Sequence, residues 1–248
     1  MKPPPPTIQI DRISFRIGDA VILDDVSLDV AEGEILVLLG ESGCGKTTLL
    51  KTINRLNEPT SGEIRIAGRA HRDWEVTELR RKIGYVLQEA GLFPHFTVEQ
   101  NVAVVPGLLN WEKERIAARV TEVLELVGLP GGKFGGRFPH ELSGGQRQRV
   151  GVARALAADP PIILLDEPFG ALDVLTRTSL QKEFSRIVRE LGKTAIFVTH
   201  DLHEAEILAN RIALMEKGRI VFLGTPAEFK TADIPLARAY LETIAAAA

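Results

Sequence analysis

The chain has 248 residues, 45% of them hydrophobic and 25% charged, which is ordinary for a globular protein with room for one large α/β domain or two small ones. Its net charge of −3 excludes a general affinity for polyanions, so nucleic acid is not an expected partner. A single cysteine excludes an intrachain disulfide, and no apolar run approaches the ~20 residues that span a bilayer. We therefore expect a soluble chain that reaches a membrane only by docking.

The first part of the sequence predicts strands that lead into a glycine-rich loop. Residues 1–7, rich in proline, are expected to be disordered. Apolar residues alternate along 8–17 and again along 26–30, as they do in half-buried strands. A continuous apolar run over 34–39 predicts a buried strand, and 46–57 predicts the helix that follows the loop.

The middle of the sequence is predicted to be mainly helical. Short strands are expected at 63–67 and 83–87. Residues 97–128 carry helical patterning, which stops at Gly128. The glycine-rich stretch 131–136 predicts a flexible linker, and Ser143 is expected to cap a helix that runs to about residue 158.

Towards the C-terminus, buried strands alternate with helices, which indicates a parallel α/β sheet. The expected elements are buried strands at 162–165 and 194–199, a helix at 172–191, a hairpin around Lys217–Gly218 and a frayed tail at 243–248. The functional residues of such sheets gather at the carboxyl ends of the strands. The predicted buried strands end at Gly40, at Asp166–Glu167 and at His200, which makes these residues candidates for a functional site.

The glycine-rich loop matches the full phosphate-binding pattern G-x-x-x-x-G-K-[ST] between a predicted strand and a predicted helix. It consists of Gly40, Glu41, Ser42, Gly43, Cys44, Gly45, Lys46 and Thr47, and Thr48 follows it. The glycines let the backbone close around phosphates, and Lys46 supplies positive charge to the β- and γ-phosphates. The Thr47 hydroxyl can coordinate Mg²⁺. The loop therefore predicts a site for a nucleoside triphosphate with Mg²⁺.

Cys44 lies inside this loop. The simpler interpretation is a small side chain that fits there. The alternative is a regulatory thiol whose pKa is lowered by the N-terminus of the following helix.

Two acidic residues end the predicted strand at 162–165. Asp166 is expected to hold Mg²⁺ through water, and Glu167 to polarise the attacking water. Alone, such a pair could equally be the polar end of a buried strand, but after a complete phosphate-binding loop the catalytic interpretation is favoured. Gln88 and His200 each follow a predicted strand. Gln88 is expected near Mg²⁺ and the attacking water, and His200 near the γ-phosphate.

The pentapeptide Leu142–Gln146 is a second stretch of small residues that opens a helix. Ser143, Gly144, Gly145 and Gln146 could offer backbone N–H groups and a helix N-terminus to anionic oxygens. One triphosphate has room for two such loops only if they face each other across it. The sequence therefore indicates half of a two-part site.

With these motifs in this order, the chain resembles the ATP-binding cassette (ABC) ATPases over about residues 8–230. The matching motifs are the phosphate loop 40–47, Gln88, the signature 142–146, the Walker B strand 162–167, the D-loop 170–173 and His200. The resemblance implies an α/β fold with a RecA-like P-loop NTPase core, an antiparallel β-subdomain and an α-helical subdomain at about 89–155. A single ABC ATPase domain is then expected to span 8–242.

The resemblance also implies a head-to-tail dimer, most simply of two identical chains, with ATP between them. Ser143 and Gly145 of one copy would contact the γ-phosphate held by Lys46 of the other copy, and Asp173 would line the dimer seam. Further implied partners are integral membrane permease subunits and, indirectly, a solute-binding protein. A groove near Gln88, walled by residues around 89–100, is expected to receive a short permease helix at the cytoplasmic face of the membrane. The apolar residues 91–94 suit such a contact, and the alternative is that Phe93 packs internally.

The family places an aromatic ring about two dozen residues before the phosphate loop, where it stacks on adenine. That position is Ile17 here, and Phe15 lies two residues earlier on the same strand face. Either Phe15 supplies the ring, or Ile17 holds the base by apolar contact alone. ATP binding should survive in both cases because such stacking contributes about 1 kcal/mol.

Several segments are similar to the importer ATPases for osmoprotectants such as glycine betaine, choline and carnitine. They are residues 91–95, 111–115, 139–142, 166–173 and 176–177. Val174 departs from the proline that is usual in that subfamily. The sequence ends at residue 248 without the C-terminal regulatory module that many of these ATPases carry, so no ionic-strength sensor is expected.

Other transport roles stay open at this point. The alternatives are an importer of amino acids or another small polar solute, and an export or lipid-trafficking motor. A soluble ABC ATPase of DNA repair or translation is disfavoured, because the sequence contains neither a long coiled-coil insertion nor a second cassette.

Overall fold

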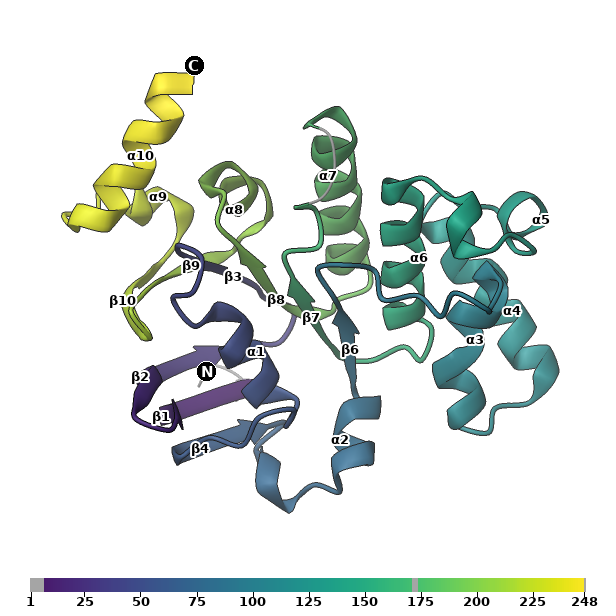
Figure 1. Cartoon of the computed structure of the whole chain (residues 1–248), viewed down its shortest axis with the longest axis horizontal. Coiled ribbons are helices and arrows are strands. Elements are labelled where there is room, and N and C mark those ends of the chain that lie inside the picture. Colours follow the sequence, from purple (N-terminus) through teal and green to yellow (C-terminus); the bar gives the residue numbers. More distant parts are fainter. Residues whose placement is uncertain (1–6, 171–173, 248) are drawn as a thin grey trace, which may run out of the picture. The chain divides into compact units, whose positions relative to one another are not determined.

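The computed structural model describes residues 7–170 and 174–247, without the side chains of 174–176 and 244–247. The chain divides into two compact units, and both contain strands and helices (Figure 1). Unit 1 combines Met1–Arg80 with Gly192–Ala248, and unit 2 is Arg81–Leu191. Within the described ranges, every helix is too short or too polar to traverse a bilayer.

Unit 1 contains four strands of a largely buried sheet. In spatial order they are β10 (Arg219–Gly224), β9 (Arg211–Glu216), β3 (Ile35–Leu39) and β8 (Thr194–Thr199). β3 pairs in parallel with β8 and β9, whereas β10 returns antiparallel to β9. Every residue of β3 and β8 is buried, which explains their continuous apolar sequences. The structure confirms both predicted strands and the hairpin at Lys217–Gly218.

An antiparallel sheet supplies the other strands of unit 1. Its order is β2 (Ala20–Val30), β1 (Ile8–Ile17), β4 (Ser61–Ile66) and β5 (Arg69–Ala70). The apolar positions of β1 are two residues apart, except between Ile10 and Ile13. Between these residues the register advances three positions on β1 but only two on β2, and Arg12 has a φ of +46°. The uneven spacing in the sequence therefore marks a β-bulge.

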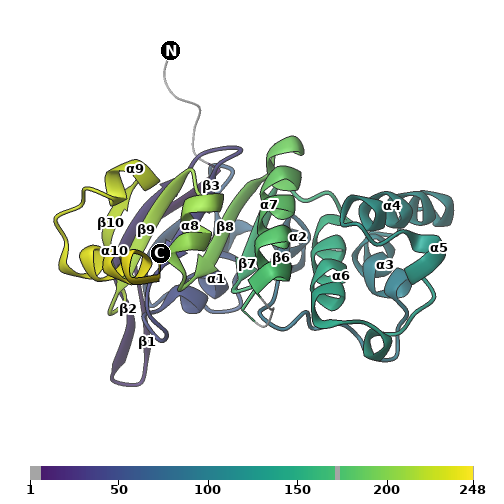
Figure 2. The same cartoon turned by 90° about the horizontal axis from the view of Figure 1, so that it is seen from above.

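The helices that begin in unit 1 cover these sheets. They are α1 (Lys46–Ile53), the 3₁₀ turn η1 (His71–Asp73), α2 (Val76–Arg81), α8 (Leu202–Leu208), α9 (Pro226–Phe229) and α10 (Pro235–Ala247). α1 and α8 lie on opposite faces of the buried strands (Figures 1 and 2). α1 thereby lies between those strands and the antiparallel sheet.

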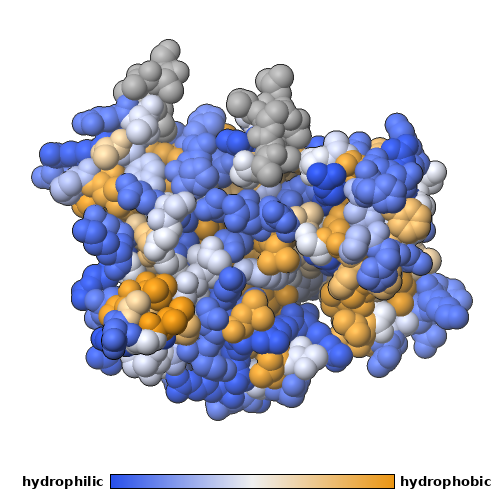
Figure 3. All heavy atoms as spheres, in the orientation of Figure 1, coloured by the Kyte–Doolittle hydropathy of each residue, from blue (hydrophilic) through white to orange (hydrophobic). Residues whose placement is uncertain are grey.

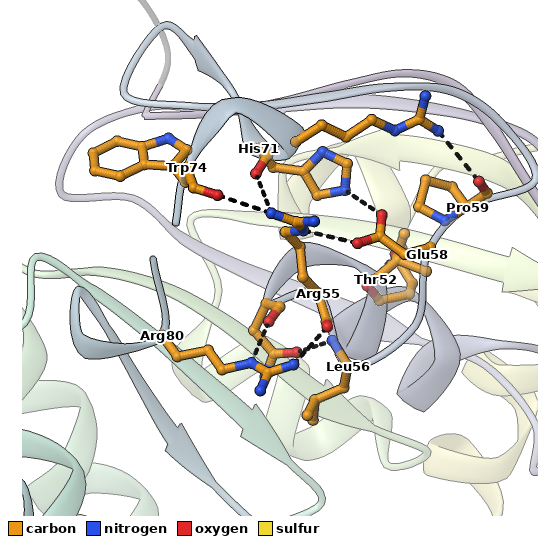
Figure 4. A network of polar contacts seen from close by, with 11 residues as sticks. Thr52, Arg55, Leu56, Glu58, Pro59, His71, Trp74 and Arg80 are labelled. Atoms are coloured by element: carbon orange, nitrogen blue, oxygen red, sulfur yellow. Dashed lines mark hydrogen bonds and ion pairs between the residues drawn. The ribbon is translucent and has the colours of Figure 1, made fainter. Parts of the chain in front are cut away.

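The helix α1 ends earlier than the sequence predicts. Its C-cap is Asn54, and Arg55 turns into the left-handed region at a φ of +55°. The guanidinium of Arg55 donates to the carbonyls of Trp74 (2.9 Å) and His71 (3.3 Å), as Figure 4 shows. Arg80 donates to the carbonyls of Asn54 (3.2 Å) and Arg55 (2.7 Å). Arg80 thus satisfies carbonyls just after the last residue of α1, and Arg55 links this helix end to the turn η1.

Unit 2 combines two strands with a group of helices. β6 (Ile83–Val86) pairs in parallel with β7 (Ile162–Asp166). The helical elements are α3 (Val98–Leu108), α4 (Lys113–Leu126), α5 (Gly131–Phe134), the 3₁₀ turn η2 (Pro139–Glu141), α6 (Gly144–Leu156) and α7 (Val174–Glu190). α3 packs against both α4 and α6, and α6 packs on β6.

Residues 131–136 are not the flexible linker that their glycines suggest. The segment begins with α5, and the ring of Phe134 is buried. A Cβ atom on Gly135 would lie 2.1 Å from the carboxylate of Glu99, so glycine allows the close approach of α3. Gly135 therefore serves packing, which a pattern of glycines alone does not distinguish from flexibility.

The turn between β9 and β10 supports the glycine-rich loop that follows β3. Lys217 and Gly218 both have positive φ, +46° and +80°. The N–H of Gly218 donates to the carbonyl of Cys44 (3.0 Å), and its carbonyl accepts from the N–H of Asp24 (2.9 Å). A Cβ on Gly218 would lie 2.5 Å from the carbonyl oxygen of Ile22, so no larger residue fits without moving the backbone.

We predict that Gly218→Ala destabilises the protein more than Gly33→Ala does. Gly33 also has a positive φ, +71°, but a Cβ there would meet no atom within 4 Å. Gly33→Ala should therefore lower the free energy of unfolding by about 1–2 kcal/mol, the cost of the left-handed backbone alone. Gly218→Ala adds a steric cost of about 1–3 kcal/mol. Urea unfolding measures both, and equal losses would contradict the close packing of this turn.

Candidate functional site

The loop from Gly40 to Thr47 connects β3 to α1, as its pattern predicts. A Cβ on Gly45 would lie 2.9 Å from the carbonyl oxygen of Ile22, so the loop presses directly on β2. A Cβ on Gly43 would meet no atom within 4 Å, so the other side of the loop is open. Gly45 is also the N-cap of α1 and supplies no side-chain cap to the first N–H groups. These features fit a bound phosphate.

Lys46 is only 4% exposed and folds back over the loop. Its Nζ donates to the carbonyls of Gly40 (2.6 Å) and Glu41 (2.8 Å). The ammonium group is therefore already positioned at the loop by backbone acceptors. Thr47 is the second residue of α1, so its hydroxyl belongs to the same helix start. Thr48 follows in the first turn.

The regulatory interpretation of Cys44 is not supported. The side chain is 8% exposed, and burial raises the pKa of its thiol although the nearby Lys46 ammonium acts in the opposite direction. The Sγ atom lies 4.0 Å from the Nζ of Lys46. The pKa is thus shifted upward rather than downward, because the apolar packing outweighs the positive charge and the helix N-terminus. The buried thiol within the loop favours the simpler interpretation of Cys44 as a small side chain that fits there.

His200 directly follows β8 and is exposed. The turn that carries it is held by side chains that the sequence analysis did not identify. The Thr199 hydroxyl donates to the buried carboxylate of Glu204 (2.5 Å) and accepts from the N–H of Asp201 (3.0 Å). Asp201 caps α8 by accepting from the N–H of His203 (2.8 Å). An aspartate before a short helix is the sequence signal for this turn.

The two candidates for an adenine contact lie at the end of β1. Phe15 is half-buried, whereas Ile17 is 64% exposed. Val21, on the neighbouring strand, is 41% exposed, and hydrophobic surface is visible over this hairpin in Figure 3. Both candidates therefore lie on a strand end with accessible apolar surface.

In unit 2, β7 ends in the two predicted acidic residues. Asp166 is 6% exposed, and the Tyr85 hydroxyl on β6 donates to its carboxylate (3.4 Å). Burial, together with the Asp166 charge, raises the pKa of Tyr85, so this phenol stays a donor. Glu167 has a φ of +43°, a conformation that costs a non-glycine residue about 1–3 kcal/mol. Tyr85 was missed because a tyrosine in a strand is normally a packing residue.

The Leu142–Gln146 stretch forms the predicted helix start. The Ser143 Oγ accepts from the N–H of Gln146 (3.2 Å), and the Gln146 side chain accepts from the N–H of Ser143 (2.9 Å). The side chain of Gln146 thus completes a capping box. The Ser143 hydroxyl can still donate its proton to an anion. Gly144 and Gly145 form the first two residues of α6.

The remaining predicted residues are Gln88, which is exposed just after β6, and Asp173, which lies outside the described residues. The proposed metal ligands Thr47, Gln88 and Asp166 all offer oxygen atoms, the donor class that Mg²⁺ prefers. Within the described residues, no group of three or more His, Cys, Asp and Glu residues could hold a metal ion alone.

Comparison with known proteins assigns the family. A family model described as ABC transporter matches residues 23–170. The glycine betaine/carnitine/choline transport ATP-binding protein OpuCA of Bacillus subtilis is 54% identical over 85% of this chain. The aligned part is 55% of that relative, so the chain spans about half of its length. The glycine betaine uptake system ATP-binding protein YehX of Escherichia coli is 52% identical over 88% of this chain and 71% of its own length.

Comparison with solved structures agrees with this family assignment. The ATP-binding cassette MJ0796, in a dimeric post-hydrolysis state bound to ADP and phosphate, superimposes with a TM-score of 0.79 at 34% identity. The match covers 88% of this chain and 98% of that one. The expected ABC ATPase fold is thereby confirmed, and this chain belongs to the ABC transporter family.

Proposed function

We propose that this chain is the ATP-hydrolysing motor subunit of an importer for osmoprotectants such as glycine betaine, choline or carnitine. The observation that carries the proposal is a complete phosphate loop together with a complete signature in a chain that is 54% identical to a glycine betaine/carnitine/choline transport ATP-binding protein. An importer for another small polar solute is the second candidate, because a sulfate/thiosulfate import ATP-binding protein of Caulobacter vibrioides is 47% identical.

In unit 1, the residues that bind phosphate are proposed to be those of the loop from Gly40 to Thr47. Lys46 would exchange its contacts with loop carbonyls for phosphate oxygens, so its ammonium group has hydrogen-bond acceptors in both states. Mg²⁺, when bound with ATP, would neutralise phosphate charge, with Thr47 as a ligand. His200 would contact the γ-phosphate from the end of β8. Phe15 and Ile17 offer the apolar surface for the base.

In unit 2, Glu167 is proposed to orient and polarise the attacking water. A positioned base of this kind typically contributes about 10²- to 10⁴-fold in rate. Asp166 and Gln88 would act at Mg²⁺. The strained backbone of Glu167 supports a catalytic role, because such conformations concentrate at functional sites.

The complete catalytic unit is proposed to be two chains arranged head to tail. The N-terminus of α6 would then bind the γ-phosphate held by the other chain, with the Ser143 hydroxyl as donor and Gly145 in close approach. Asp173 would lie at the seam. The dimeric state of the cassette MJ0796 supports this arrangement.

Permease subunits are proposed to dock near residues 91–96, at the cytoplasmic face of the membrane. Phe93 is 41% exposed, which favours a contact surface over internal packing, and its ring lies 5.3 Å from that of Phe96. The buried Asn101 side chain holds this loop by accepting from the N–H of Phe93 (2.8 Å) and donating to the carbonyl of Phe96 (3.1 Å). A rigid apolar surface of this kind suits an amphipathic helix.

We predict that Glu167→Gln traps an ATP-bound dimer. Loss of the base should slow hydrolysis by at least about 100-fold, while the phosphate-binding groups stay intact. Size-exclusion chromatography with light scattering in ATP should show a dimer, and the added change Lys46→Ala should restore the monomer. Glu125→Gln, on the exposed face of α4, is the matched charge control and should hydrolyse ATP normally. A monomeric Glu167→Gln protein in saturating ATP would contradict the two-chain site.

We also predict that Cys44 is alkylated slowly, with a rate that rises with pH. Because burial raises its pKa above the ordinary value for a thiol, the reactive thiolate is a minor form at neutral pH, and the iodoacetamide rate should keep rising into the alkaline range. Bound ATP should slow the reaction further by holding the loop closed over the thiol. A rate that levels off below pH 8 would contradict the raised pKa. Equal alkylation rates with and without ATP would indicate that bound nucleotide does not shield Cys44.

A further inference from the structure

One face of α6 contacts the segment that contains Gln88. Gln148, Gly151 and Arg154 are three residues apart, so they form one row along the helix surface. All three lie against the backbone of residues 87–91, which we call the Gln88 loop. The helix that presents Ser143 at its first turn is therefore also the support of the Gln88 loop.

The contacts are made to backbone carbonyls on both sides of Gln88. The buried amide of Gln148 donates to the carbonyl of Leu87 (3.2 Å). The Arg154 guanidinium donates to the carbonyls of Ala90 (2.7 Å) and Gly91 (2.8 Å). A guanidinium that forks between two carbonyls fixes both position and orientation of the loop.

Close backbone packing strengthens this connection. A Cβ on Gly151 would be 3.5 Å from the Cβ of Ala90, which leaves room for nothing larger than a methyl group. A Cβ on Gly84 of β6 would lie 2.6 Å from the carbonyl oxygen of Ala155. The strand that leads into the Gln88 loop thus touches the backbone of α6, and a shift of one should move the other.

We propose that Gln148 and Arg154 are positioning residues that make the Gln88 loop and α6 move as one piece. The inference rests on the proposed function, in which Gln88 acts at the Mg²⁺ of its own chain's nucleotide and Ser143 serves the nucleotide of the other chain. A displacement of the Gln88 loop would then be transmitted along α6 to Ser143. Three hydrogen bonds between α6 and the Gln88 loop would then couple the two nucleotide sites through one helix.

The same helix offers a matched control. Arg149 is also a partly buried arginine, and it donates to the carbonyl of Val127 (2.6 Å) and pairs with Glu183 (2.5 Å). Both of these partners lie outside the Gln88 loop. If Arg154 were only a packing residue, Arg154→Met and Arg149→Met should have the same consequences.

The first experiment is hydrogen exchange on the intact chain without nucleotide. In Arg154→Met, amides of residues 87–97 should exchange at least about fivefold faster than in the wild type, because the loop loses both carbonyl contacts. Gln148→Leu should give a smaller increase, and Arg154→Lys should recover part of the protection. Arg149→Met should leave this segment unchanged. Unchanged exchange in Arg154→Met, or an equal increase in Arg149→Met, would overturn the proposal.

The second experiment measures coupling in ATP hydrolysis. The wild type should show a Hill coefficient that approaches about 2, and Arg154→Met should reduce it towards 1. Binding of a fluorescent ATP analogue to the monomer should change by less than about twofold, because the phosphate loop is untouched. A Hill coefficient retained in Arg154→Met would overturn the proposal. A wild type without ATP turnover would instead contradict the proposed function, and the exchange experiment would still decide whether the loop is held by α6.

Discussion

The residues from Gly40 to Thr47 can bind phosphate only because other parts of unit 1 hold their backbone in place. Gly45 presses against the carbonyl of Ile22, and the carbonyl of Cys44 accepts from the turn between β9 and β10. Lys46 is kept at the loop by two carbonyls of the loop itself. These contacts of Gly45 and Cys44 involve backbone atoms alone, so these parts of the loop keep their shape without large side chains that would fill the space for phosphate.

In unit 2, the helix start that is proposed to bind phosphate is held in place by side-chain hydrogen bonds. The N-terminus of α1 has no side-chain cap, whereas that of α6 is closed by the reciprocal bonds of Ser143 and Gln146. The cap stiffens the first turn of α6 and still leaves the Ser143 hydroxyl with a proton to donate. Further along the same helix, Gln148 and Arg154 hold the Gln88 loop. A helix with such fixed ends is suited to transmit a displacement rather than absorb it.

Much of the strand arrangement and the position of the candidate residues could be predicted from the sequence. The continuous apolar runs identified β3, β7 and β8, and the structure places the glycine-rich loop, the Asp166–Glu167 pair and His200 at the ends of these strands, as predicted. Where local pattern and tertiary packing disagreed, the sequence was less informative. Gly135 makes room for the Glu99 side chain, and α1 stops where Arg80 donates to the carbonyls of Asn54 and Arg55. Burial raises the pKa of the Cys44 thiol more than the Lys46 charge lowers it. Tyr85, Thr199 and Glu204 act through partners distant in sequence or through a buried turn, which no motif describes.

The central claim is that each nucleotide site needs the phosphate loop of one chain and the signature of another. Lys46→Ala and Ser143→Arg should each abolish ATP turnover alone. In a mixed dimer of the two variants, one site combines both defects and the other site is intact. Mixing equal amounts should therefore restore up to about a quarter of wild-type turnover, because half of randomly paired dimers are mixed and each has one working site. A mixture no more active than either variant would contradict the account, since it would mean that Ser143 serves the site of its own chain.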